Sequence, residues 1–315
     1  MLLVALVEAE PIVDWAKAGW EWLGFLGAFG TLGALGYRFA VCDRVYGDAL
    51  LLSPGDHGTG VSAALGRTDA TAGLIGFVGA LLATASLFGK MLRPAAKGGQ
   101  SVIEYASQGD AMRTFTVVAT LAVVVLFALA WRRVHAAWPF AMALAIALIL
   151  RNAVVGEWAK LINPLHETGG ALWLGTLFVL VVAGFPAAAH PDVPAPVRSA
   201  LFARMVKAFN PLALGGAVLS AVFGVTTALR HVPRLDAMWS TPYGLVLDAK
   251  LCLVAAIAGM GFHNWRRLTP QIGTDAGSVA LNRSARREVM VVAVLLLVTA
   301  ILVSTPDIDA GPGGP

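Results

Sequence analysis

A histidine stands near the start of a long apolar stretch, seven residues before a tryptophan: His166 and Trp173 in the segment LHETGGALWLG, residues 165–175. Seven residues make almost two helical turns, so the two side chains share one face. An ionisable side chain at the mouth of a membrane helix is costly to place and indicates a functional site. The functional interpretation of His166 is a metal or haem ligand. The alternative is an interfacial histidine that is hydrogen-bonded to a loop carbonyl.

Three further side chains could bind a metal ion. His231 and Met238 precede a later apolar stretch, and His263 ends it. Imidazole and thioether groups suit Cu(I), and a loop carrying His231 and Met238 could fold over His166; the alternative is a plain interfacial loop. His263 would be an inner-side ligand or an interfacial polar residue. It cannot share a site with His166, because the two lie at opposite ends of the bilayer, roughly 25–30 Å apart.

Neighbouring side chains could support these ligands. Glu167 could hold the second nitrogen of the His166 ring, as carboxylates do beside metal sites, or be solvated. Trp173 is expected to be a packing residue rather than a cation–π neighbour of a metal.

Lys250 is expected to be structural or charge-compensating. It could reach outward to the lipid headgroups, or it could face inward with Asp248 or a carboxylate on another helix as its partner. Tyr243 and Lys250 are seven residues apart and share a helix face. The Lys250 ammonium has no lone pair, so it cannot bind a metal ion. Glu288 is expected at the same depth as His263, where the two could make contact at the cytoplasmic face.

The composition is that of an integral membrane protein. Hydrophobic residues make up 57% of the 315 residues and charged residues 13%, against about 25% charged residues in soluble domains. The net charge of +4 is no nucleic-acid signal, because the basic residues fall in short loops between apolar runs, where they determine topology.

The predicted fold is all-α, a polytopic transmembrane bundle of about eight helices. The apolar runs cover residues 19–41, 70–92, 114–132, 136–155, 165–187, 207–229, 243–265 and 287–305. Residues 43–69 and 93–113 are predicted to be loops from their Gly, Pro and Asp content, and residues 133–135 a tight hairpin. With both termini outside, thirteen Lys and Arg residues fall inside and nine outside, which agrees with the positive-inside rule. We expect two parts, a four-helix region over residues 1–160 and a second over 161–315.

The second part resembles the copper-resistance D (CopD) family of bacterial inner-membrane proteins. The resemblance rests on the His166-to-Trp173-x-Gly spacing, on the block TPYG…K at 241–250 with its N-x-R-R ending at 264–267, and on Glu288. It covers about residues 160–306. It implies a multi-pass copper-handling protein, embedded in membrane lipids, that moves copper across the inner membrane beside a periplasmic copper-binding partner.

Other observations limit the kind of site. The eight methionines form no MxM or MxxM cluster, and the two cysteines lie far apart, so any copper site is expected to be transient and of low coordination. Copper transport or tolerance is the leading hypothesis. The alternatives are a b-type haem protein with His166 and His231 as axial ligands, and a structural subunit of a larger membrane complex. No nucleophile motif, phosphate loop or catalytic carboxylate pair is found, so no enzyme is expected.

Overall fold

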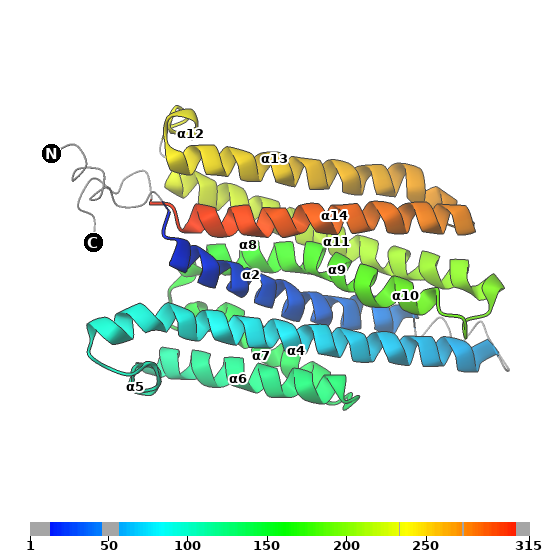
Figure 1. Cartoon of the computed structure of the whole chain (residues 1–315), viewed down its shortest axis with the longest axis horizontal. Coiled ribbons are helices and arrows are strands. Elements are labelled where there is room, and N and C mark those ends of the chain that lie inside the picture. The colour runs from blue at the N-terminus through cyan, green and yellow to red at the C-terminus, as the bar shows by residue number, and fades with distance from the viewer. Residues whose placement is uncertain (1–12, 46–56, 233, 273, 307–315) are drawn as a thin grey trace, which may run out of the picture.

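The chain folds into a bundle of long antiparallel helices (Figure 1). The computed structural model describes residues 13–45, 57–232, 234–272 and 274–306, and within these ranges all regular structure is helical. The long helices are α2 (Trp15–Gly36), α4 (His57–Lys97), α6 (Ala111–Trp131), α7 (Ala137–Val154), α11 (Ala195–His231), α13 (Pro242–His263) and α14 (Asp275–Val303). The prediction of an all-α polytopic bundle is confirmed.

Short helices complete the chain. One crossing of the bundle consists entirely of consecutive short segments: η2 (Trp158–Leu161), α8 (Ile162–Gly170), η3 (Ala171–Gly175), α9 (Thr176–Val179), η4 (Leu180–Gly184) and α10 (Phe185–Ala188). The remaining ones extend or connect the long helices: η1 (Tyr37–Cys42), α5 (Val102–Ser107), α12 (Ala237–Ser240), η5 (Asn264–Leu268) and η6 (Thr269–Gln271).

Seven helical segments among the described residues are long and apolar enough to cross a membrane, so this is a multi-pass membrane protein. The eighth predicted run, residues 287–305, covers the second half of α14 and the two residues after it, but that helix begins at Asp275 and ends at Val303. Arg286, Arg287 and Glu288 therefore fall inside the helix rather than at its start. They keep α14 from meeting the same apolar criterion, although it packs beside α13 and α2 in the bundle (Figure 1).

Two predicted loops are partly wrong. Residues 57–69 belong to α4, because the segment VSAALG supplies good helix formers directly after the glycines; residues 46–56 lie outside the described range. The 93–113 connection contains the rest of α4 and the short helix α5, whose start is a capping box between Ser101 and Glu104. The hairpin after α6 is confirmed, and Arg133 adopts a left-handed φ of +66° there.

The helices alternate between two ends of the bundle (Figure 1). We call these the His166 end, where α2, α6, α8 and α13 begin, and the Arg133 end. The start of α2 and the end of α14 meet at the His166 end, where the Asp14 N–H donates to the carbonyl of Ser304 over 3.3 Å. Arg93 and the backbone N–H of Lys17 hold the pKa of Asp14 below its usual range. The start of α2 and the end of α14 therefore lie on one side of the bundle; that this side faces outward stays a prediction.

Glycines let α2 pack at the centre of the bundle. Gly27, Gly30 and Gly33 lie against Ala83, Gly79 and Gly175 in turn, so α2 touches α4 of the first part and η3 of the second. Small residues allow this close approach of membrane helices. The division of the chain near residue 160 stays a prediction, and α2 packs against both parts.

A buried charge cluster joins three elements near the Arg133 end. Asp69 of α4, whose side chain is only 4% exposed, lies 2.9 Å from Arg38 Nε of η1. Its other oxygen lies 3.3 Å from Nε2 of His135, just before α7. His135 is exposed, and it nevertheless pairs with this carboxylate.

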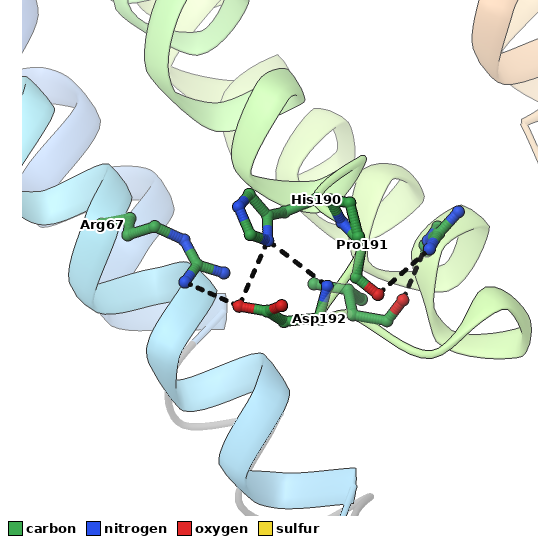
Figure 2. Close-up of polar contacts among 6 residues, drawn as sticks. Arg67, His190, Pro191 and Asp192 are labelled. Carbon is green, nitrogen blue, oxygen red and sulfur yellow. Dashed lines mark hydrogen bonds and ion pairs between the residues drawn. The ribbon is translucent and has the colours of Figure 1, made fainter.

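The connection from α10 to α11 is tied to α4 at the same end (Figure 2). Asp192 pairs with Arg67 of α4 over 3.1 Å, and His190 Nδ1 lies 3.3 Å from the same carboxylate oxygen. His190 therefore belongs to this surface contact.

The crossing of α8 and α11 provides a test of glycine packing. A Cβ on Gly216 would lie 2.7 Å from the carbonyl oxygen of Gly169, whereas a Cβ on Gly215 would meet nothing within 4 Å. Gly216→Ala is therefore expected to lower the unfolding free energy in detergent by about 1–3 kcal/mol, as overpacking does. Gly215→Ala, one residue away on the same helix, is the control and should be close to neutral. Equal effects of the two substitutions would contradict the close packing.

Candidate functional site

The α8–α11 crossing positions His166. Gly169 and Gly216 bring the two helix backbones together, and the His166 ring lies against the third glycine, Gly224; a Cβ there would lie 2.7 Å from His166 Cε1. This packing holds the partly buried imidazole between the two helices.

The His166 ring is oriented by a main-chain carbonyl. Its Nδ1 lies 2.7 Å from the carbonyl oxygen of Ser220 and 3.3 Å from Ser220 Oγ. A carbonyl only accepts hydrogen bonds, so Nδ1 carries the proton and the lone pair is on Nε2. Histidines that bind metals are held in this way through their other nitrogen. The partner of Nδ1 is thus the Ser220 carbonyl and not Glu167, for which the sequence had left both a role beside the ring and a solvated position open; adjacent residues leave a helix about 100° apart.

His166 does not lie at the very end of the bundle. Two other contacts between α11 and the residues before His166 lie closer to that end: Thr227 Oγ1 is 2.9 Å from Asn163 Oδ1, and Arg230 donates to the carbonyl of Ala159 over 3.3 Å. The ring thus packs at the level of Ser220–Gly224, about 10–16 Å along α11 from its last residue, His231.

His231 is oriented in the same way as His166. It ends helix α11 rather than lying in a loop, and its Nδ1 donates to the Thr227 carbonyl over 2.9 Å. Its ring stacks on Tyr243 with centroids 6.0 Å apart. Its Nε2 is therefore also the nitrogen with the lone pair. Met238 lies in α12, on the following connection. The structure places these groups at the His166 end of the bundle, with His231 further along α11 than Ser220 and Gly224, which touch the His166 ring.

Helix α13 and its continuation η5 present a regular stripe of residues to the interior. Tyr243, Lys250, Ile257 and Asn264 recur every seven residues, and all but Lys250 are buried. The Lys250 charge is near enough to His166 to act on the ring electrostatically. Among the described residues, the Lys250 ammonium has no ion-pair partner. Asp248, considered as a partner from the sequence, lies on another face of the helix.

Glu167 faces the first part of the chain. The charges of Lys90, Glu21 and Arg151 act on its carboxylate, and Lys90 and Glu21 pair with each other over 2.8 Å. His166 and Glu167 are therefore adjacent in sequence but belong to separate environments.

A second polar group lies toward the Arg133 end. Glu288 is 3% exposed and accepts a hydrogen bond from Asn264 Nδ2 over 3.0 Å. Ser284 Oγ donates to Asn264 Oδ1 over 2.5 Å. The predicted contact between His263 and Glu288 is wrong, because His263 points to the exposed face of α13 while Asn264, one residue later, faces inward.

An apolar block separates the two polar groups. Leu174, Ile257, Val292, Leu295 and Leu296 form one buried cluster, with Trp173 packed against it. Three residues of this block lie seven residues, about 10 Å along their helix, from a polar residue of the interior: Trp173 from His166, Ile257 from Lys250, and Leu295 from Glu288. The expectation that Trp173 is a packing residue agrees with this cluster.

The potential metal-binding side chains of the described residues are dispersed. Within the described part of the chain, no three His, Cys, Asp or Glu side chains form a group that could hold a metal ion. Sequence reasoning gave no site role to Ser220, Asn264 and Ser284, although Asn264 is the first residue of the N-x-R-R motif. The seven-residue stripe on α13 could have revealed Asn264. Ser220 acts through its main-chain carbonyl, which leaves no mark on the sequence.

The comparisons with known proteins identify one family. Residues 203–302 match the family Copper resistance protein D, which confirms the resemblance expected from the sequence. The match begins later than the predicted residue 160. It includes His231, Lys250 and Glu288, and His166 precedes it. No curated protein and no solved structure matches the chain.

Proposed function

We propose that this chain carries copper across the bacterial inner membrane. Copper is the cargo and passes through the interior of the part formed by α8, η3, α11, α13 and α14. The match to Copper resistance protein D over residues 203–302 supports copper as the substrate. The multi-pass fold supports a role within the membrane.

The observation that carries the proposal is the orientation of two interior histidines. The Nδ1 groups of His166 and His231 are bound to the carbonyls of Ser220 and Thr227, so each ring has its lone pair on Nε2. Neutral imidazole is a good ligand for copper. His231 is the first ligand that copper meets and His166 the deeper one, with Met238 near the entrance.

The same geometry favours brief binding. The two rings lie at different levels, and the Lys250 ammonium repels a cation beside His166. A transported ion must bind strongly enough to enter and weakly enough to leave. We infer that copper moves from one histidine to the next, and that a periplasmic copper-binding protein delivers it to the His166 end.

Metal analysis and copper uptake test the proposal together. The purified protein, reconstituted in liposomes, is expected to take up Cu(I) supplied with ascorbate, and cells that produce it should change their copper content. The absorption spectrum of the same sample distinguishes the alternative function. A Soret band would favour a b-type haem protein, and stoichiometric partner proteins without copper uptake would favour a structural subunit; either result would contradict copper transport.

A further inference from the structure

Glu288 is a buried carboxyl group in the interior of a membrane bundle. It lies about 21 Å along α14 from Leu302, which packs near Tyr243 and the His166 end. It is therefore well inside the bundle and on the far side of the apolar block from His166. Intramembrane carboxyl groups are costly and are typical of proton relays in transporters.

The charged groups around Glu288 do not neutralise the negative charge that its carboxylate would carry. Asn264 is the polar group that faces it from η5, and Ser284 lies one turn earlier on α14. The nearest basic side chains of the packed elements are exposed, apart from the partly buried Arg204 of α11: His263, Arg266 and Arg267 on α13 and η5, Lys207 on α11, and Arg283, Arg286 and Arg287 on α14. The charged residues of α2, Lys17 and Glu21, lie in the first two turns of that helix, at the His166 end. Lys250 is fourteen residues, about 20 Å, from Asn264 along α13 and η5. Helices α9 and η4 carry apolar residues and glycine apart from Thr176, which binds the Gly33 carbonyl.

The surroundings favour the neutral acid. Moving an unpaired carboxylate from water into an apolar interior costs much free energy, whereas moving the protonated carboxylic acid costs far less. Asn264 Nδ2 satisfies Oε2 in either form, because both accept a hydrogen bond there. Oε1 faces Gly261, where even an added Cβ would remain 3.6 Å away. This leaves room for a proton on Oε1.

We propose that Glu288 is a proton-binding site that exchanges one proton for each copper ion transported. This rests on the proposed copper transport. A single carboxyl group compensates one positive charge at a time, so an arriving Cu(I) ion and a proton compete for it. When copper reaches this level, the O–H bond of Glu288 breaks, the electron pair stays on the oxygen and the proton leaves to water at the His166 end, from which the copper came. When copper has left toward the Arg133 end, the carboxylate takes up a proton from water at that end, so that one proton moves out for each copper ion that moves in. A carboxylate is a poor Cu(I) ligand, so its role is charge compensation rather than tight binding.

The experiment measures copper and protons together. The full chain is reconstituted in phosphatidylcholine liposomes that contain a pH-sensitive dye, and Cu(I) is added outside with ascorbate. The wild-type protein is expected to move about one proton out for each copper ion taken up. Glu288→Gln, which keeps a carbonyl oxygen for Asn264, should lower the protons moved per copper at least tenfold. Glu104→Gln, a change of an exposed carboxylate, is the matched control and should behave as wild type.

A second measurement uses the wild-type protein alone. A hydrophobic carbodiimide reacts with protonated carboxyl groups in apolar surroundings, so it should label Glu288, and Cu(I) should reduce this labelling. This result is independent of whether Glu288→Gln folds.

The possible failures are distinct. Copper uptake with no proton movement, unchanged coupling in Glu288→Gln, or labelling that is insensitive to Cu(I) would overturn the proton exchange and leave copper transport standing. An absence of copper uptake by the wild-type protein would overturn the proposed function itself.

Discussion

Replacement of His166 by alanine is expected to lower the rate of copper uptake at least about 100-fold. Its Nε2 is the deeper of the two proposed ligand atoms, and its orientation is set by the Ser220 carbonyl at 2.7 Å. Even the groups that orient metal-binding histidines are worth about 10–100-fold in affinity or activity, so loss of the ligand itself should have at least the larger effect. The measurement is Cu(I) uptake by liposomes, together with the copper content of cells.

Three substitutions separate the ligand from its surroundings. Ser220→Ala keeps the main-chain carbonyl and removes only the hydroxyl at 3.3 Å, so its effect should be small. Gly224→Ala adds a methyl group 2.7 Å from the ring, and it should reduce uptake about tenfold by displacing the imidazole. His190→Ala changes a histidine at the other end of the bundle and should have no effect. Wild-type uptake by His166→Ala would contradict the site.

Replacement of Asp69 by leucine is expected to destabilise the protein by about 3 kcal/mol, the lower end of the cost of breaking a buried ion pair. The substitution leaves the Arg38 guanidinium, which is 15% exposed, without its buried partner. It also removes the contact to His135. Arg38 retains its other partner, Asp43, which is why the upper end of the range is not expected. Unfolding by denaturant in detergent micelles measures the change.

Two controls show whether burial is the cause. Asp43→Asn alters the more exposed partner of Arg38, and it should cost less than about 1 kcal/mol, as exposed pairs do. The double substitution Arg38→Met with Asp69→Leu removes both charges, and it should recover most of the lost stability, since apolar replacements of buried pairs are often neutral. A double variant as unstable as Asp69→Leu would contradict this explanation.

Much of the architecture follows from local sequence properties. The scarcity of charge and the length of the apolar runs require membrane helices, and the seven spans and α14 occur where the apolar runs were predicted. The hairpin after α6 also follows from its short connection. These features depend only on the surrounding lipid and on residues close in sequence. An apolar run therefore predicts a membrane span regardless of which helices it packs against.

Helix ends were less predictable. The segments 57–69 and 275–286 were expected to be outside the helices, yet they extend α4 and α14. Hydropathy marks where a helix enters the hydrocarbon region but not where its hydrogen bonds end, because a helix can continue into water.

The partners of the polar residues depend on how the helices pack. Seven-residue spacing predicted that Tyr243 and Lys250 share a face, and extending it by two steps reaches Asn264. Spacing could not select Asn264 rather than His263 as the partner of Glu288, because consecutive residues differ by about 100° around the helix and only the rotation of α13 against α14 decides which faces inward. In the same way, the residues around His166 indicated a ligand, but the carbonyl that orients it comes from Ser220, 54 residues later. A main-chain carbonyl is the same in every residue, so its role arises only when the glycines of α8 and α11 bring the two backbones together.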